Sequence, residues 1–170
     1  MRGDRKAQKA LYDRFAPKMF GVCLRYAGNS DEAEDILQDG FIKVFNKMDS
    51  FRSEGSFEGW VRRIFVNTAI EYFRRKTYLQ PITEWEETTV EGNLLSAVEH
   101  LAQKDIIALV QQLSPGYRTV FNLYVVEGHT HRQIADLLGI SEGTSKSQLA
   151  RAKTILQDLV KKHLDPQKYS

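Results

Sequence analysis

The stretch HTHRQIADLLGISEGTSKSQLARAKTIL, residues 129–156, decides the fold of this chain. Its first part predicts a short helix over 130–138, because apolar residues recur there at helical spacing. Gly139 follows where a helix ends with a positive φ, which glycine adopts without strain. Ser141 is then expected to cap a second helix, whose first turn contains Glu142. Two helices joined by so short a turn predict a helix-turn-helix motif.

The second helix of this motif has a buried face and a basic face. Positions 145, 149, 152 and 156 share one side, and Leu149, Ala152 and Leu156 predict that this side packs inward. Ser145 lies there too, and its hydroxyl is expected to need a backbone hydrogen-bond partner. The neighbouring face suits a major groove, where Lys and Arg bond guanine and Ala meets the thymine methyl. The alternative is a helical corner whose basic face is merely solvated. The basic face presents Lys146, Ser147, Ala150, Arg151 and Thr154.

The first half of the chain predicts an amphipathic helix with an acidic side. Over 31–48 the apolar residues recur every three or four positions, and the polar run 29–31 offers capping oxygens. Glu32, Asp35 and Asp39 lie on one side of this helix. That side is either a solvated face or a surface for a basic partner.

Aromatic and basic residues alternate over 51–76, where a further helix is expected from about 57 to 76. Such a mixture favours single-stranded DNA, because rings stack on bases and cations neutralise phosphates. The alternative is a hydrophobic core with a basic rim, above all for Trp60 and Phe65. The aromatic residues are Phe51, Phe57, Trp60, Phe65, Tyr72 and Phe73, and the basic ones are Arg62, Arg63, Arg74, Arg75 and Lys76.

The remaining segments predict an all-α fold of two small helical domains joined by a flexible linker. One helix is expected over 5–15 and another from about Pro17. The stretch 80–93 has four Glu and no Lys or Arg, which indicates an extended acidic linker. Helical periodicity resumes over 94–113, and a new helix is expected to begin at Pro115 after a turn.

Composition excludes several classes of protein. The 170 residues carry a formal net charge of only +2 and a single cysteine, Cys23, so no intrachain disulfide is possible. No apolar run is long enough to span a bilayer, and the first ten residues lack an apolar signal core. A soluble cytoplasmic protein is therefore expected.

The sequence contains no Gly-rich phosphate loop and no Ser-His-Asp spacing, so an enzyme is not expected. His129 and His131 would lie on different helix faces, so neither a metal site nor any cofactor is expected.

Together these segments resemble the extracytoplasmic-function (ECF) group of sigma factors of bacterial RNA polymerase. The resemblance covers nearly the whole chain, in five blocks that keep the family's order and spacing. The blocks are GDRKAQKALYDRF (3–15), DEAEDILQDGFIKVFNKMDSF (31–51), SFEGWVRRIFVNTAIEYFRRK (56–76), LSPGYRTVFNLYVVEG (113–128) and the helix-turn-helix.

The resemblance implies sigma region 2 over 1–78, an acidic linker over 79–104 and sigma region 4 over 105–170. Region 2 is expected to bind the β′ clamp helices of core RNA polymerase and to trap a flipped base of the −10 element in an apolar slot closed by the loop 52–58. The residues implied for polymerase binding are Asp35, Gln38, Asp39 and Ile42. Those implied for the −10 element are Phe51, Arg62, Arg63, Ile64, Asn67, Arg74, Arg75 and Lys76.

Region 4 is implied to read the −35 element and to rest against the β flap. The implied residues are Arg132, Gln133, Lys146, Ser147, Gln148, Ala150, Arg151 and Lys153. The family's reader helix usually begins Gly-Thr-Val-Lys-Ser-Arg, so Ser145 and Gln148 depart from it and put the −35 sequence preference in question. The resemblance also implies an anti-sigma factor as partner and a linker that growing RNA displaces, with no small-molecule substrate and no membrane insertion.

The competing interpretation is a stand-alone helix-turn-helix regulator that binds DNA as a dimer. The absence of a receiver or ligand domain and the aromatic–basic block over 51–76 argue against it. A free sigma factor is expected to bind DNA weakly and with strong salt dependence, whereas such a regulator would bind a palindrome tightly by itself.

Overall fold

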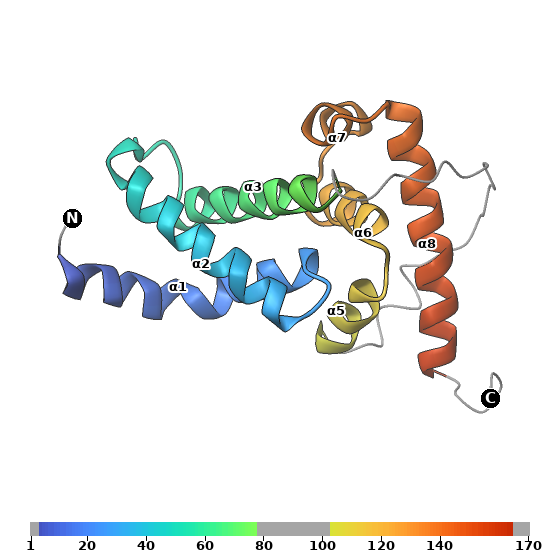
Figure 1. Cartoon of the computed structure of the whole chain (residues 1–170), viewed down its shortest axis with the longest axis horizontal. Coiled ribbons are helices and arrows are strands. Elements are labelled where there is room, and N and C mark those ends of the chain that lie inside the picture. The colour runs from blue at the N-terminus through green and yellow to red at the C-terminus, as the bar shows by residue number, and fades with distance from the viewer. Residues whose placement is uncertain (1–3, 78–102, 165–170) are drawn as a thin grey trace. The chain divides into compact units, whose positions relative to one another are not determined.

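The computed structural model describes residues 4–77 and 103–164, and throughout these ranges the regular elements are helices (Figure 1). The chain divides into two compact units between Arg75 and Lys76. The all-α expectation is therefore confirmed for the described residues. The linker predicted over 79–104 lies outside them except for residues 103 and 104, which are helical, and so does the first part of the helix predicted over 94–113.

The first unit consists of α1 (Arg5–Tyr26), α2 (Ser30–Lys47), a short 3-10 helix η1 (Met48–Ser50) and α3 (Phe57–Thr77). Asp4 caps α1 by accepting hydrogen bonds from the amides of the second and third helical residues, and Asn29 caps α2 by accepting from Glu32 N. Buried side chains from all three long helices form one core, including Met19, Ile36, Val44, Val61 and Phe65.

The expectation of two helices separated near Pro17 was wrong, because α1 runs through that residue without a break. A proline inside a helix removes one backbone hydrogen bond and crowds the preceding turn. Pro17 is exposed, however, and the residues around it, Phe15 and Met19, are buried in the core. The packing of this face outweighs the lost hydrogen bond.

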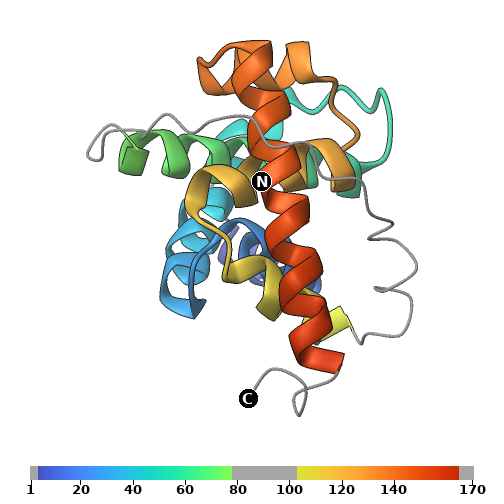
Figure 2. The same cartoon turned by 90° about the vertical axis from the view of Figure 1, so that its right-hand side faces the viewer.

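The second unit consists of α5 (Gln103–Gln111), α6 (Pro115–Phe121), a π-helical turn η2 (Asn122–Val126), α7 (His131–Leu138) and α8 (Glu142–Leu164). The long helix α8 contacts α5, α6 and α7 (Figure 2). Its buried row carries Leu149, Ala152, Leu156 and Val160 into a core shared with Val120, Leu123 and Ile134.

No described helix combines the length and apolarity needed to cross a membrane. The residues that the structure describes also contain no group of three or more His, Cys, Asp or Glu side chains able to hold a metal ion.

Cys23 should resist thiol reagents as long as the first unit stays folded. Its side chain is fully buried in α1, and burial raises the pKa of the thiol to about 12 from a reference of 9.0. At pH 8 the folded state then holds about a thousandfold less reactive thiolate than the unfolded chain. We expect labelling by a chromogenic disulfide reagent to follow unfolding of the first unit as urea is added. Fast labelling of the native protein would contradict this burial.

Candidate nucleic-acid interface

The helix-turn-helix has the geometry expected from its sequence. Thr130 caps α7 in a capping box, in which its hydroxyl accepts from Gln133 N and its amide donates to Gln133 Oε1. Gly139 ends α7 in the left-handed region with φ 68°. Ser141 Oγ then accepts from Thr144 N at 2.9 Å at the start of α8. These contacts fix the turn between the two helices at both ends.

The buried row of α8 is confirmed, but the partner of Ser145 differs from the expected one. Ser145 is fully buried beside Leu149, Ala152 and Leu156. Its hydroxyl lies 3.0 Å from Nδ1 of His131, a side chain of α7, and not against a backbone group. The contact links residues fourteen positions apart, so local periodicity could not reveal it.

A small aromatic and basic cluster surrounds His131. The imidazole stacks on Tyr124 of η2 with ring centroids 4.6 Å apart, and Lys153 Nζ lies 6.0 Å from the centre of the Tyr124 ring. Burial, helped by the positive charges of Lys146 and Lys153 and opposed by Glu142, lowers the pKa of His131 below its usual value. The neutral form of the imidazole is therefore favoured at pH 7.

The residues predicted to face the −35 element fall into two groups. Lys146, Lys153, Arg132 and Gln133 are exposed, and the oxygen of Gln133 is engaged in the capping box. The others are half-buried. A Cβ added at Gly116 would lie 3.2 Å from Oε1 of Gln148, so the glutamine amide is placed beside α6. The half-buried residues are Ser147, Gln148, Ala150 and Arg151.

The acidic side of α2 carries an exposed apolar residue at its C-terminal end. Asp35 and Gln38 are exposed and Asp39 is half-buried. Ile42 is 58% exposed, although it is a large aliphatic side chain on a helix whose other aliphatic residues pack inward. Exposing so much of an isoleucine next to Asp39 suits a partner surface with both apolar and basic groups.

Phe51 stands at the edge of an aromatic cluster. Its ring lies 5.2 Å from that of Phe57 and 5.4 Å from that of Trp60, and Phe57 in turn contacts Phe15. Asn67 is exposed, whereas Ile64 is only 8% exposed and can form no more than the floor of a slot. Phe65 is fully buried, as the core alternative expects, whereas Phe51 and Trp60 are half-buried.

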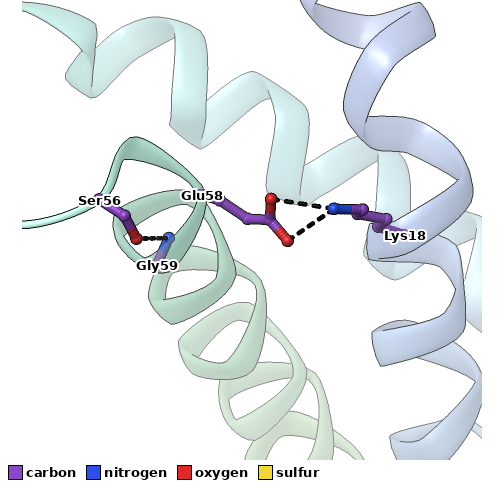
Figure 3. A network of polar contacts seen from close by, with 4 residues as sticks. All are labelled: Lys18, Ser56, Glu58 and Gly59. Carbon is purple, nitrogen blue, oxygen red and sulfur yellow. Dashed lines mark hydrogen bonds and ion pairs between the residues drawn. The ribbon is translucent and has the colours of Figure 1, made fainter.

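The loop between Phe51 and α3 is held at one end by polar contacts that Figure 3 shows. Lys18 of α1 forms a bidentate ion pair with Glu58, at 2.9 and 3.0 Å. Ser56 Oγ accepts from Gly59 N at 3.0 Å, which caps α3. Within the loop Ser53 has φ 57°, a left-handed conformation that costs a serine free energy. The end of the loop is thus fixed by the cap of α3, and the loop contains one residue in an unfavourable conformation.

The predicted phosphate contacts line the helix α3. Arg63, Arg74 and Arg75 are exposed, and Arg62 and Lys76 are half-buried. Arg75 lies 3.9 Å from Glu71, which also pairs with Lys43 of α2 at 2.6 Å. Such an exposed ion pair is weak, so the exposed arginines remain able to bind a polyanion.

Comparisons with known proteins agree with this arrangement. The family model described as Sigma-70 region 2 matches residues 11–78, and the one described as Sigma-70, region 4 matches residues 103–156. The ECF RNA polymerase sigma factor SigW of Bacillus subtilis is 30% identical over 168 residues, which cover 92% of this chain and 90% of that protein. The chain belongs to the ECF RNA polymerase sigma factors.

Other relatives support the same family. The ECF RNA polymerase sigma-E factor of Haemophilus influenzae is 28% identical to this sigma factor, covering 93% of this chain and 89% of that one. SigE of Mycolicibacterium smegmatis is also 28% identical, but the match spans only 65% of that longer protein. The solved structure of RpoE with the anti-sigma factor NepR from Bartonella quintana shares the fold, with a TM-score of 0.52, 23% identity and coverage of 92% and 98% of the two chains.

Membership of this family identifies a promoter-recognising subunit of RNA polymerase, and the stand-alone regulator is not favoured. Sequence reasoning missed three features of the sigma factor's second unit: the capping box, the stack of Tyr124 on His131, and the hydrogen bond between His131 and Ser145. Only the capping box has a sequence signal, a Thr followed three residues later by Gln.

Proposed function

We propose that the first unit docks on core RNA polymerase through the acidic side of α2 and holds the melted −10 element along α3. The second unit reads the −35 element with α8. The domain ranges 1–78, 79–104 and 105–170 and the site residues named above form part of this proposal. The protein acts inside the cell on the polymerase, without catalysis of its own.

The observation that carries the proposal is the orientation of α8. Its buried row packs on α6 and α7, and Lys146 and Lys153 stay exposed on the neighbouring face, beside His131 at the start of α7. A helix held in this way presents its basic face to the major groove of DNA. The exposed Arg132 lies on α7, the first helix of the motif, where such helices contact the DNA phosphate backbone.

An anti-sigma factor is the further partner we propose. RpoE of Bartonella quintana was solved with such a partner, and the exposed Ile42 on α2 gives this chain an apolar patch that a competitor of the polymerase could cover. The β flap is proposed as the contact of the second unit.

The direct experiment mixes the purified protein with core polymerase and measures binding to promoter DNA from its own genome. We expect the free chain to bind weakly and with strong salt dependence, and the holoenzyme to bind specifically and to change where transcription starts. Tight binding of a palindrome by the free chain would overturn the proposal and favour a regulator.

Replacing Lys146 by alanine tests the reader helix. We expect Lys146→Ala to weaken holoenzyme binding to a promoter with an intact −35 element by about 1–3 kcal/mol if the lysine bonds a base, and to relax specificity at one position. Lys161→Ala removes the same charge from an exposed site near the end of α8 and serves as the matched control. Equal effects of the two variants would mean that Lys146 contributes charge alone.

A further inference from the structure

A polar contact is buried between the two helices of the motif. Ser145 is fully buried on the inward row of α8, and His131 Nδ1 lies 3.0 Å from its hydroxyl oxygen. Within the described part of the chain, this ring nitrogen is the hydrogen-bond partner found for the hydroxyl. A buried hydroxyl left without a partner is costly, so the contact ties the position of α7 to that of α8.

The proton count of this pair favours one form of the imidazole. In the neutral tautomer that carries its proton on Nε2, Nδ1 accepts from the Ser145 hydroxyl and both groups are satisfied. If Nδ1 carries a proton instead, it becomes the donor and the hydroxyl proton must turn to another acceptor. Helix geometry offers it the i−4 carbonyl, that of Ser141, which would then accept a second hydrogen bond beside that of the Ser145 amide at 3.0 Å.

The surroundings of the ring disfavour its protonation. Tyr124 of η2 covers one face, and α8 contributes Lys146, Lys153 and Glu142. Two of these charges repel an imidazolium and one attracts it, and Arg132 follows in the same helix. Burial is the main cause that keeps the pKa of the ring low, and the lysines that would read DNA add to it.

We propose that His131 is a positioning residue for −35 recognition: as a neutral imidazole it accepts the buried Ser145 hydroxyl and holds α7 against the beginning of the reader helix. The inference rests on the proposed function of α8. It makes the reading of the −35 element dependent on pH, because protonation replaces the acceptor by a donor and adds a cation beside Lys146.

The sign of the pH effect separates this role from a simple phosphate contact. An imidazolium that only met a phosphate would strengthen DNA binding as the pH falls. A positioning imidazole gives the opposite result. Its pKa is lower in the folded chain than in the unfolded one, so its stabilising effect is complete above about pH 6.5 and is lost as the pH falls below that value.

The experiment uses the full-length protein in the holoenzyme. It measures the ratio of affinities for two promoter fragments that differ only in an intact or scrambled −35 element, at pH 7.5 and at pH 5.8. The ratio cancels effects of pH on the polymerase and on the −10 element. We expect the ratio to fall at the lower pH for the natural sequence, by no more than about fivefold, because an imidazole with a pKa below 6.5 is only partly protonated at pH 5.8.

Four variants test the pairing. His131→Asn keeps an acceptor near the position of Nδ1 but does not titrate, so the ratio should stay high at both pH values. His131→Leu should lower it at both, because the hydroxyl loses its partner. Ser145→Ala should abolish the part of the pH response that comes from the lost hydrogen bond and leave only the effect of the added charge, and Ser145→Ala added to His131→Leu should restore most of the ratio. A double variant no better than His131→Leu alone would overturn the proposal.

Nitrogen NMR of the histidines in the full-length chain gives an independent measure, with the His131 signals assigned by their loss in His131→Asn. We expect Nδ1 unprotonated and Nε2 protonated at pH 7.5. The opposite tautomer would overturn the proposed hydrogen bond. A natural protein without any −35 dependence at pH 7.5 would refute the proposed function itself, whereas −35 dependence unaffected by His131 would refute only this inference.

Discussion

Gly40→Ala is expected to destabilise the first unit by about 3 kcal/mol or more, because α2 and α3 leave no room for a side chain there. A Cβ at this position would lie 2.3 Å from Cε1 and 2.6 Å from Cδ1 of Phe65. The Phe65 ring is fully buried and meets the edge of Phe41 at 5.2 Å between centroids. It cannot move aside without displacing its neighbours, so the helices must separate.

Gly21→Ala is the matched control for this variant. Gly21 also lies inside a long helix, but nothing is found within 4 Å of its added Cβ. We expect this change to stabilise the first unit by about 0.5–1 kcal/mol, because alanine is the better helix former. Urea unfolding of the full-length chain, followed by circular dichroism, compares the two. A Gly40→Ala variant as stable as the natural chain would mean that α2 and α3 are not in this close contact.

This pair of glycines shows where sequence reasoning stops. Periodicity predicted the long helices α2 and α3 and both helices of the motif, because each must bury one face. It cannot tell that Gly40 is a contact point and Gly21 is open, since that depends on which helix packs opposite. Pro17 shows the same limit: its local effect predicted a break, and the packing of Phe15 and Met19 prevents it.

In the candidate site, too, the local features were predictable from the sequence, but the contacts between helices were not. Gly139, Ser141 and the buried row of α8 follow from local rules, and the structure confirms them. The environment of Ser145 does not follow from such rules, because His131 comes from another helix. The roles of single residues on α2 and α3 depend on partners that the fold alone does not contain, so they stay predictions.

The second large effect is expected from Asp39→Arg, which places a cation in the middle of the proposed polymerase-binding face. The inward side of α2 is formed by Ile36, Leu37, Gly40, Phe41 and Val44. Asp35, Asp39 and Ile42 lie on the other side, with Asp39 half-buried and Ile42 58% exposed. The fold of the first unit should therefore tolerate the change, which circular dichroism can verify.

Binding of core polymerase should fall by at least about a hundredfold in Asp39→Arg, because like charges brought together at an interface cost several kcal/mol. Asp13→Arg makes the same charge change at an exposed position of α1, outside the proposed face, and should stay within about threefold of the natural chain. Ile42→Ala should lose about tenfold, since only its apolar contact is removed. Competition for fluorescently labelled core polymerase measures all three. If Asp39→Arg competes as well as Asp13→Arg, the polymerase binds elsewhere on this unit, and the exposed isoleucine on α2 needs a different partner.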